Sequence, residues 1–372
     1  MNRLINTLFC LQFFCSILIL SLINSSCSKN PVRLKIIDPS ESTPTPLTYE
    51  NGIFIINEGN YNWGNASVNF LDNKNNTLIH DIFMKSNARS LGDVAESMKI
   101  IRNLGYLVIN NSNRIEVVSL KDFKSIKSIT GLFSPRYIEV VNSDKAYATN
   151  LQNNISIIDL RNNSVTGAIQ TSTWTENLLM FDKYMLVNSI GNFNEPSSRR
   201  KAQVFVIDTQ TDSIVDSIQT GKEPVGIVID INKKVWVLCS GGYDNYEAPS
   251  LIQINPESRE VEKVLTFPNP KEVPSRLCIN SSGDTIYYIK GGVFQMPITS
   301  NTLPDQPLIP SDGRLFYGLA VHPNTGNIYV SDAKDYVQNG AAFQYSVKGT
   351  LIRQFVTGRI PGSFCFTKNS IK

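Results

Sequence analysis

Short runs of alternating hydrophobic and polar residues fill most of the chain, and one of these runs recurs at a fixed spacing. It consists of an apolar–polar pair, polar turn residues and a second apolar position. Two short strands joined by turn residues form a β-hairpin. The pattern predicts this hairpin five times, linking Leu71-Asp72 with Ile82, Val118-Ser119 with Ile129, Ile158-Asp159 with Ile169, Ile207-Asp208 with Ile218 and Ile254-Asn255 with Leu265.

Prolines mark a second recurring strand. Each of four prolines precedes an apolar strand position by three residues, and because proline lacks an N–H it is tolerated at the first residue of a strand. A further short strand follows three of them, and the whole unit recurs every roughly 40 to 50 residues, as expected for four-stranded propeller blades. The four motifs begin at Pro135, Pro224, Pro274 and Pro361.

The count of second strands predicts an all-β, seven-bladed β-propeller. They lie near Phe54, Leu107, Tyr147, Met185, Trp236, Tyr288 and Tyr329. The first blade begins with its second strand, and the C-terminal segment is an innermost strand without partners. We therefore expect the C-terminal strand to complete blade one and close the ring, which removes the exposed sheet edges. The segment Gly292 to Pro310 in blade six departs from the repeat. Helical periodicity is otherwise absent, and Ala95 to Ile101 is the one segment whose pattern is also compatible with a helix.

The N-terminus predicts export. Arg3 is followed by an apolar stretch to Ile23 and then by Asn24-Ser25-Ser26-Cys27, which is typical of a lipoprotein signal peptide cleaved before an acylated cysteine. We expect residues 1–26 to be the signal, Cys27 the lipidation site, residues 27–49 a proline-containing tether and residues 50–372 the propeller. The alternative is an uncleaved anchor helix, because about 20 apolar residues span a bilayer.

Charge and residue usage exclude several classes of function. The net charge of +3 is small and evenly spread, which argues against a nucleic-acid partner. The two histidines, His80 and His322, are far apart, and the domain cysteines lack metal-type spacing. We expect those cysteines to pack in the interior, and we expect no catalytic residue, no metal and no cofactor. Asp244, Glu247, Asp332 and Asp335 lack the spacing of a calcium loop.

The long loops predict a ligand-binding face. Strands alternate in direction within a blade, so the loops between second and third strands share a face with the loops between blades. These loops are rich in aromatic and amide side chains, which provide contact area at low entropic cost; the alternative is that the rings pack on neighbouring blades. The predicted ligand-binding residues are Asn60, Tyr61, Trp63, Phe133, Arg136, Trp174, Tyr243, Tyr246, Arg314, Tyr317 and Tyr336.

The opening of the first blade resembles a known family. The run Asn57-Glu58-Gly59-Asn60, followed by Trp63, Asn65, Ser67, Phe70 and Asp72, is similar to the start of YncE-like seven-bladed propeller lipoproteins of Gram-negative bacteria. The chain also resembles their surface cobalamin-binding members, which partner a TonB-dependent transporter. The resemblance implies a protein that is lipid-anchored in the outer membrane at the cell surface. It also implies that this protein captures cobalamin or a related corrinoid and passes it to the transporter.

Three other functions remain as alternatives. A glycan-binding surface lipoprotein would stack a sugar on Trp63 or Trp174. A propeller hydrolase or lactonase needs a base or metal at the central channel, whereas the strand count places His322 beside a turn on the opposite face. A scaffold role in surface assembly is the third. A binding protein that is not an enzyme is the function that the sequence favours.

Overall fold

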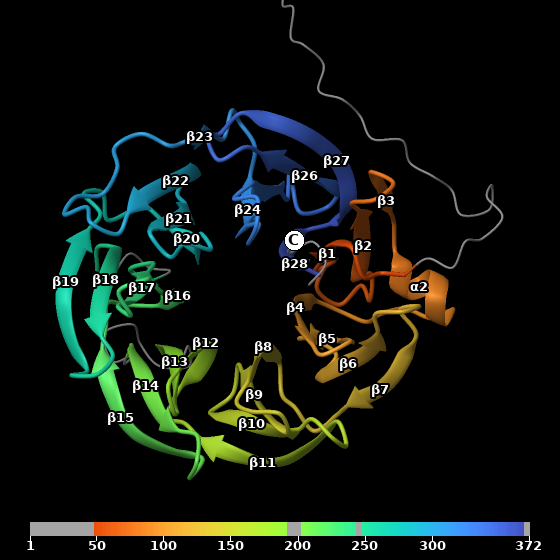
Figure 1. Cartoon of the computed structure of the whole chain (residues 1–372), viewed down its shortest axis with the longest axis horizontal. Helices are drawn as coiled ribbons and strands as arrows, with labels where there is room; N and C mark the ends of the chain where they lie inside the picture. The colour runs from red at the N-terminus through yellow and green to blue at the C-terminus, as the bar shows by residue number, and fades with distance from the viewer. Residues whose placement is uncertain (1–47, 192–201, 243–246, 368–372) are drawn as a thin grey trace, which may run out of the picture. The chain divides into compact units, whose positions relative to one another are not determined.

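Seven four-stranded antiparallel sheets are arranged around a central axis (Figure 1). This computed structural model describes residues 48–191, 202–242 and 247–367. The sheets follow one another along the chain, each running from an innermost to an outermost strand, so the predicted all-β, seven-bladed propeller is confirmed.

The first three blades occupy residues 52–170 together with the C-terminal strand. Blade 1 contains, from the inside outwards, β28 (Pro361–Phe366), β1 (Gly52–Asn57), β2 (Ser67–Asp72) and β3 (Thr77–Ile79). Blade 2 contains β4 (Ala95–Ile101), β5 (Leu104–Ile109), β6 (Arg114–Ser119) and β7 (Ser125–Ile129). Blade 3 contains β8 (Pro135–Val140), β9 (Lys145–Asn150), β10 (Asn154–Asp159) and β11 (Ser164–Gln170).

The remaining four blades occupy residues 174–359. Blade 4 contains β12 (Trp174–Phe181), β13 (Tyr184–Gly191), β14 (Gln203–Asp208) and β15 (Ser213–Gln219). Blade 5 contains β16 (Pro224–Ile229), β17 (Val235–Cys239), β18 (Ser250–Asn255) and β19 (Glu260–Thr266). Blade 6 contains β20 (Ser275–Ile279), β21 (Thr285–Ile289), β22 (Gly292–Pro297) and β23 (Ile309–Pro310). Blade 7 contains β24 (Phe316–Val321), β25 (Ile328–Asp332), β26 (Asn339–Tyr345) and β27 (Leu351–Arg359).

The ring closes through the C-terminal strand, as predicted. β28 pairs antiparallel with β1, placing Phe364 opposite Ile55 and Phe366 opposite Ile53. The Gly52 amide donates to the Thr367 hydroxyl over 2.9 Å, which fixes the end of the ladder. Blade 1 is therefore built from both ends of the propeller, and its second strand β1 has no unpaired edge.

The polar residue of each recurring hairpin accepts a hydrogen bond from the backbone two residues further on. Asp159 Oδ1 accepts from the Arg161 amide over 2.8 Å, and the same contact is made in four other blades. Such side chains stabilise tight turns by replacing a backbone acceptor. The equivalent acceptors are Asp72, Ser119, Asp208 and Asn255.

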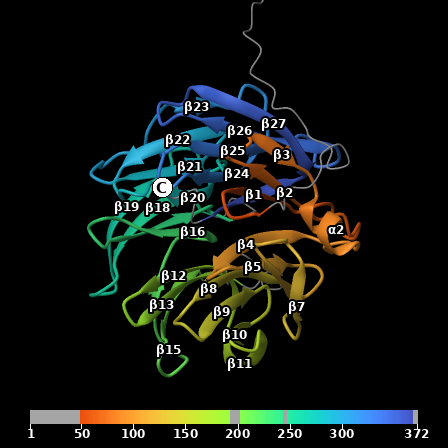
Figure 2. The same cartoon turned by 45° about the vertical axis from the view of Figure 1, so that its right-hand side comes forward.

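One expectation for the early part of the chain needs correction, and one possibility left open by the sequence is settled. Ile82 is the first residue of the helix α2 (Ile82–Asn87) instead of an outer-strand residue, because Asp81 adopts a left-handed conformation and caps the helix at the Met84 amide. Figure 2 shows α2 outside β2 and β3. The segment Ala95–Ile101, whose pattern is also compatible with a helix, forms strand β4.

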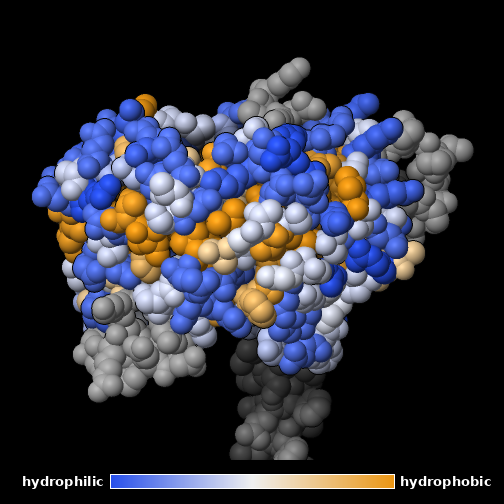
Figure 3. Space-filling view, turned by 90° about the horizontal axis from the view of Figure 1, so that it is seen from below, coloured by the Kyte–Doolittle hydropathy of each residue, from blue (hydrophilic) through white to orange (hydrophobic). Residues whose placement is uncertain are grey.

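The core lies between neighbouring blades. Between blades 5 and 6, for example, Trp236 and Tyr288 are completely buried, and Phe267 meets Tyr288 edge to face with 5.6 Å between ring centroids. From the edge of the ring, hydrophobic residues form patches separated by hydrophilic side chains (Figure 3). Between these two blades the second strands therefore supply the largest completely buried side chains.

The cysteines of the propeller are free thiols in packed positions. Cys239 is buried, whereas Cys278 and Cys365 are partly buried against the clusters of neighbouring blades. Burial raises the pKa of each thiol to about 12, so these sulfurs are protonated at neutral pH. Within the described residues, no helix has the length and hydrophobicity needed to span a bilayer; Cys27 and the N-terminal signal lie outside those residues.

Candidate functional site

Every innermost strand has a register shift near its first residues. A β-bulge of this kind leaves a residue outside the ladder and turns its side chain in a new direction. In blades 2 and 3 the unpaired residues include Glu96 and Arg136, and the corresponding residues of blades 4, 6 and 7 include Glu176, Arg276 and Tyr317. The innermost strands surround the axis (Figure 1), so these bulges bring polar side chains from five blades toward the centre.

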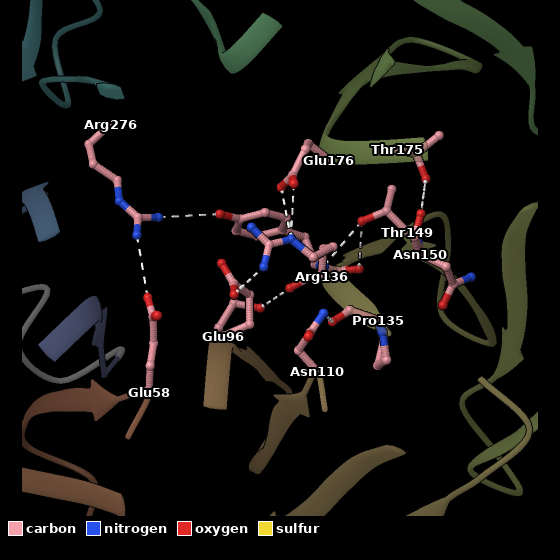
Figure 4. Close-up of polar contacts among 12 residues, drawn as sticks. Glu58, Glu96, Asn110, Pro135, Arg136, Thr149, Asn150, Thr175, Glu176 and Arg276 are labelled. Carbon is pink, nitrogen blue, oxygen red and sulfur yellow. Dashed lines mark hydrogen bonds and ion pairs between the residues drawn. The ribbon is translucent and has the colours of Figure 1, made fainter. Parts of the chain in front are cut away.

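One half of this polar cluster is centred on Arg136. Its Nε donates to the two carboxylate oxygens of Glu176 over 3.0 and 3.1 Å, and its Nη1 donates to Glu96. Figure 4 shows the guanidinium between the two carboxylates, which come from the blades on either side of blade 3. Both carboxylates are at least nine-tenths buried, so this ion pair network is shielded from solvent.

The other half is centred on Arg276. Its Nη2 lies 3.5 Å from Glu58 Oε1, and its Nη1 donates to the Tyr137 hydroxyl over 3.5 Å. The Tyr317 hydroxyl donates to Glu58 Oε2 over 3.0 Å. Because Arg276 belongs to blade 6 and Tyr137 to blade 3, this contact spans the axis and brings the second half of the cluster against the blade that carries Arg136.

Glu58 reaches the cluster because Gly362 has no side chain. A Cβ at Gly362 would lie 2.2 Å from Glu58 Oε1, well inside contact distance. Glu58 belongs to the loop between β1 and β2, yet only 8% of its surface is exposed. The small residue in β28 thus allows a loop carboxylate to occupy the place that bulge side chains take in other blades.

The cluster holds three carboxylates and two guanidiniums, so its charges do not balance when all are ionised. Burial, and then the neighbouring Glu96 carboxylate, raise the pKa of Glu58 to about 7, while Arg276 and Tyr317 lower it. Burial also raises the pKa of Glu176. Burial alone would lower the pKa of Arg136, but Glu176 and Glu96 raise it well above its ordinary value. Glu58 is therefore the group that can gain or lose a proton near neutral pH.

Three of the predicted ligand-binding residues meet where blades 7 and 1 adjoin. The Tyr317 ring meets the Tyr336 ring edge to face, with 5.8 Å between their centroids. The Asn60 side-chain amide donates to the Tyr336 carbonyl. Since Tyr317 also bonds Glu58, these residues connect the buried cluster to the protein surface.

Four of the predicted aromatic residues face solvent, three of them near this seam and Phe133 between blades 2 and 3. We define the long-loop face by the loops 58–66, 130–134, 267–274, 311–315 and 333–338, which lie at one end of the blades. Within the described residues, the exposed aromatic side chains all lie on this face. They are Tyr61, Trp63, Phe133 and Tyr336, with 67%, 73%, 50% and 43% of their surfaces exposed.

A hollow of about 340 Å³ lies beside these aromatic loops. It is bordered by residues 64–67, next to Trp63, by Met84 of α2 and by Asn339 and Arg359 of blade 7. The Arg359 Nε donates to the Val337 carbonyl over 2.7 Å, which ties the end of β27 to the loop that carries Tyr336. The seam between blades 7 and 1 therefore combines exposed rings, a hollow and a series of side-chain contacts that leads to the buried cluster.

The remaining predicted residues are placed differently. Arg136 points into the buried cluster. Arg314 lies with its guanidinium 5.0 Å from the centroid of the Phe343 ring and 3.6 Å from Asp312. Trp174 is half-buried at the start of β12. Tyr243 and Tyr246 lie outside the described residues.

His322 and three loop carboxylates support local structure. His322 is buried, and its Nδ1 accepts from the Asn324 and Thr325 amides in a turn on the face opposite the long loops. Asp332 accepts from the Leu315 amide and Asp335 from the Val337 amide. Glu247 Oε1 accepts from the Lys222 amide, while Asp244 lies outside the described residues. Among the residues that the structure describes, no three His, Cys, Asp or Glu side chains are grouped to hold a metal ion.

Sequence reasoning missed most of the buried cluster. The sequence predicts Arg136 and Tyr317 as ligand-binding residues because they adjoin long loops. It does not predict the other members of the cluster as such, which are Glu58, Glu96, Tyr137, Glu176 and Arg276. A partial signal was present in the repeat, since Arg136 and Arg276 follow Pro135 and Pro274 within two residues. A charged residue directly after a strand-initiating proline is unusual for a buried strand and could have indicated the cluster.

Comparison with known families gives one match over most of the chain. Residues 51–355 match a family model described as a domain of unknown function, DUF5074. No curated protein matches the chain.

Several solved structures share the fold at low sequence identity. A quinonprotein alcohol dehydrogenase-like protein from Bacteroides thetaiotaomicron has a TM-score of 0.65 at 16% identity, covering 86% of this chain and 79% of that one. The dihydro-heme d1 dehydrogenase NirN has a TM-score of 0.60 at 12% identity, covering 92% and 78%. The hydrazine synthase of Kuenenia stuttgartiensis has a TM-score of 0.56 at 14% identity, covering 72% and 87%. At these identities the likeness concerns the fold alone.

Proposed function

We propose that this chain, which belongs to the DUF5074 family, is a lipid-anchored binding protein that captures cobalamin or a related corrinoid on its long-loop face. In this proposal Cys27 carries the lipid anchor in the outer membrane, and the bound corrinoid passes to a TonB-dependent transporter. The corrinoid and the transporter come from the sequence resemblance of the first blade, and the binding face comes from the loops.

The gathering of exposed aromatic side chains on one face carries the proposal. Large apolar residues scattered singly are normal on a protein surface, whereas a concentration of exposed rings on one face marks a binding surface. Tyr61, Trp63 and Tyr336 lie around the seam of blades 7 and 1 and leave much of their ring surface free. Each is held by a loop whose backbone is hydrogen-bonded to a neighbour, so little entropy is lost on binding.

The chemistry of a corrinoid matches this surface. Its macrocycle offers a broad apolar face against which aromatic rings can pack. Its amide side chains donate and accept hydrogen bonds at the rim, where asparagine and backbone groups of loops 58–66 and 333–338 can meet them. The neutral, amide-rich rim also requires no strong charge on the loops, in keeping with the small net charge of the chain.

Calorimetric titration tests the proposal. Cyanocobalamin is titrated into the full-length chain in detergent micelles, and we expect saturable heat with one-to-one stoichiometry. Trp63→Ala should weaken binding by about tenfold or more, since a central aromatic contact contributes on the order of 1–3 kcal/mol. Trp63 is 73% exposed, so its removal should leave the folding free energy nearly unchanged.

Ile231→Ala provides the matched control. Ile231 is a large hydrophobic residue with 65% of its surface exposed, but it lies in the turn between β16 and β17 on the opposite face. This variant should bind cyanocobalamin as the parent does. Absence of heat with cyanocobalamin and other corrinoids would reject corrinoid capture, and a screen of glycans would then test the alternative. Equal weakening by both variants would reject the long-loop face as the site.

A further inference from the structure

A half-open cavity lies beside the sixth blade where that blade departs from the propeller repeat. Its outermost strand β23 has only two residues, and residues 298–308 replace the missing length of strand. Between this segment and blade 5 lies a cavity of about 540 Å³, within the range of small-molecule sites. Its walls include Thr266 and Phe267 at the end of β19 and Asn301–Asp305 of the replacing segment.

The segment that replaces the strand is held in place. The Lys263 ammonium donates to the Ser300 carbonyl over 3.2 Å, and the Ser300 hydroxyl donates to the Thr302 carbonyl over 2.7 Å. Leu303 packs against the core cluster between blades 5 and 6. These contacts fix the position of residues 300–303, which form part of this wall of the cavity.

A charged pair lines the cavity. The Lys290 ammonium donates to Glu272 Oε1 over 3.0 Å, and both side chains are more than three-quarters buried. The same ammonium lies 4.7 Å from the centroid of the Phe294 ring and 5.6 Å from that of Phe267. Two aromatic faces and one carboxylate oxygen therefore fix the position of this cation.

Among the described residues, two buried oxygens near this pair lack hydrogen-bond partners. Glu272 Oε2 is buried without a donor, and so is the hydroxyl of Tyr288, a completely buried residue between Phe267 and Phe294. Glu272 adds to the effect of burial in raising the pKa of Tyr288, which indicates that the two groups are close. A buried carboxylate oxygen without a donor is costly. Oε2 is closed to the cavity in this structure, so a ligand hydroxyl relieves that cost when the carboxylate turns towards it.

We propose that this cavity binds a small polyhydroxylated molecule of the sugar class. Lys290 Nζ can donate to one ligand hydroxyl, and an adjacent hydroxyl can donate to the Glu272 carboxylate once that group turns Oε2 towards the cavity, so a vicinal diol matches the pair. An ammonium ligand is disfavoured because it would be repelled by Lys290. A carboxylate ligand is disfavoured because it would be repelled by Glu272 and Asp305. The apolar Pro268, Leu303 and Pro304 around the pair suit the C–H face of a sugar ring.

The site is separate from the proposed corrinoid surface. It lies between blades 5 and 6, whereas Tyr61, Trp63 and Tyr336 lie around the seam of blades 7 and 1. No residue lines both hollows. The inference therefore does not depend on the ligand of the long-loop face.

Ligand-observed NMR tests the inference. Saturation transfer is measured from the full-length chain to a mixture of the methyl glycosides of glucose, galactose, mannose and xylose. The double variant Glu272→Gln/Lys290→Met removes the pair without leaving a buried unpaired charge. We expect saturation transfer from the parent chain to at least one glycoside. In the double variant the affinity for that glycoside should fall by about tenfold or more.

Two further variants separate the site from a general effect. Glu262→Gln/Lys234→Met removes a comparable pair, 2.7 Å apart, from the surface of blade 5 and should leave transfer unchanged. Leu303→Trp should reduce transfer by filling the cavity while retaining the charged pair. Absence of transfer to every glycoside would overturn the inference and leave water as the occupant. Transfer that survives both the Glu272/Lys290 and the Leu303 changes would also overturn it.

Discussion

Glu58 links the surface loop of blade 1 to the buried centre of the propeller. Its carboxylate accepts from Tyr317 and faces Arg276, while Glu96 adds a second negative charge nearby. Removing such a group from water favours its neutral form, and the nearby carboxylate acts in the same direction. Proton uptake by Glu58 should therefore contribute to the pH dependence of stability.

We predict that Glu58→Gln removes part of that pH dependence. The folded protein keeps the Glu58 proton up to a pKa of about 7, whereas the unfolded chain loses it near the ordinary value of 4.5. The contribution is thus fully present below about pH 4.5 and is lost as the pH rises through 7. At pH 8 the variant should be more stable than the parent by on the order of 2 kcal/mol, and near pH 4.5 the two should be similar. Urea unfolding at both pH values measures the difference.

Glu260→Gln is the control for the loss of a charge. Glu260 is an exposed residue at the start of β19, so its replacement should shift stability little at either pH. A Glu58→Gln variant whose stability runs parallel to that of the parent from pH 4.5 to 8 would contradict the proposed state of Glu58.

The buried cluster could not be recognised from the local sequence around each of its residues. Glu58 and Arg276 are separated by 218 positions, and Glu96, Arg136 and Glu176 lie on three different blades. Each residue looks like an ordinary charged position beside an apolar run. Only the closed ring brings them together, and the bulges that direct them inward leave no mark in the hydrophobic pattern.

At the scale of elements, the repeat predicted more than the individual residues did. The prolines at 135, 224 and 361 are the first residues of β8, β16 and β28, and Pro274 directly precedes β20. Ile129, Ile169, Ile218 and Leu265 are buried in outermost strands as expected. These features follow from local rules, since strand starts and turns are set by residues close in sequence.

The misplacement of Ile82 has a local cause. Ile82 and Phe83 are both fully buried, so their hydrophobicity fits either a strand or a helix. The left-handed backbone of Asp81, with φ of 41°, ends the outer hairpin and starts α2. A non-glycine residue in that conformation depends on its surroundings, which a periodicity argument does not include.

We predict that closure by β28 is required for cooperative folding. A chain ending at Ile360 lacks β28, so β1 loses one hydrogen-bonded neighbour and the side chains of Phe364 and Phe366 leave the cluster shared with Tyr329. The exposed edge of β1 should also promote aggregation. Thermal unfolding followed by circular dichroism should show a loss of the cooperative transition or a much lower midpoint.

A chain ending at Thr367 keeps β28 whole and serves as the control. It should retain the transition of the full chain, because the Gly52 contact to Thr367 is preserved. A chain ending at Ile360 that unfolds with the same midpoint and cooperativity would show that the ring does not need this strand.

At the scale of the whole molecule, the two faces of the propeller differ in the loops that they carry. The loops that carry Tyr61, Trp63, Phe133 and Tyr336 lie at one end of the blades, and the opposite end carries short turns capped by side chains such as Asp230 and His322. The sequence predicted which loops share a face, because strand direction follows from counting. It did not predict which rings are exposed, since that depends on how each loop packs against the next blade.

The most direct test of ligand capture on the long-loop face is hydrogen–deuterium exchange with and without cyanocobalamin. The account predicts slower exchange in residues 58–66, 130–134 and 333–338, which carry the exposed rings. It predicts no change in the turns at 230–234 and 322–327 on the opposite face. Protection confined to those turns, or no protection at a saturating concentration of cyanocobalamin, would contradict it.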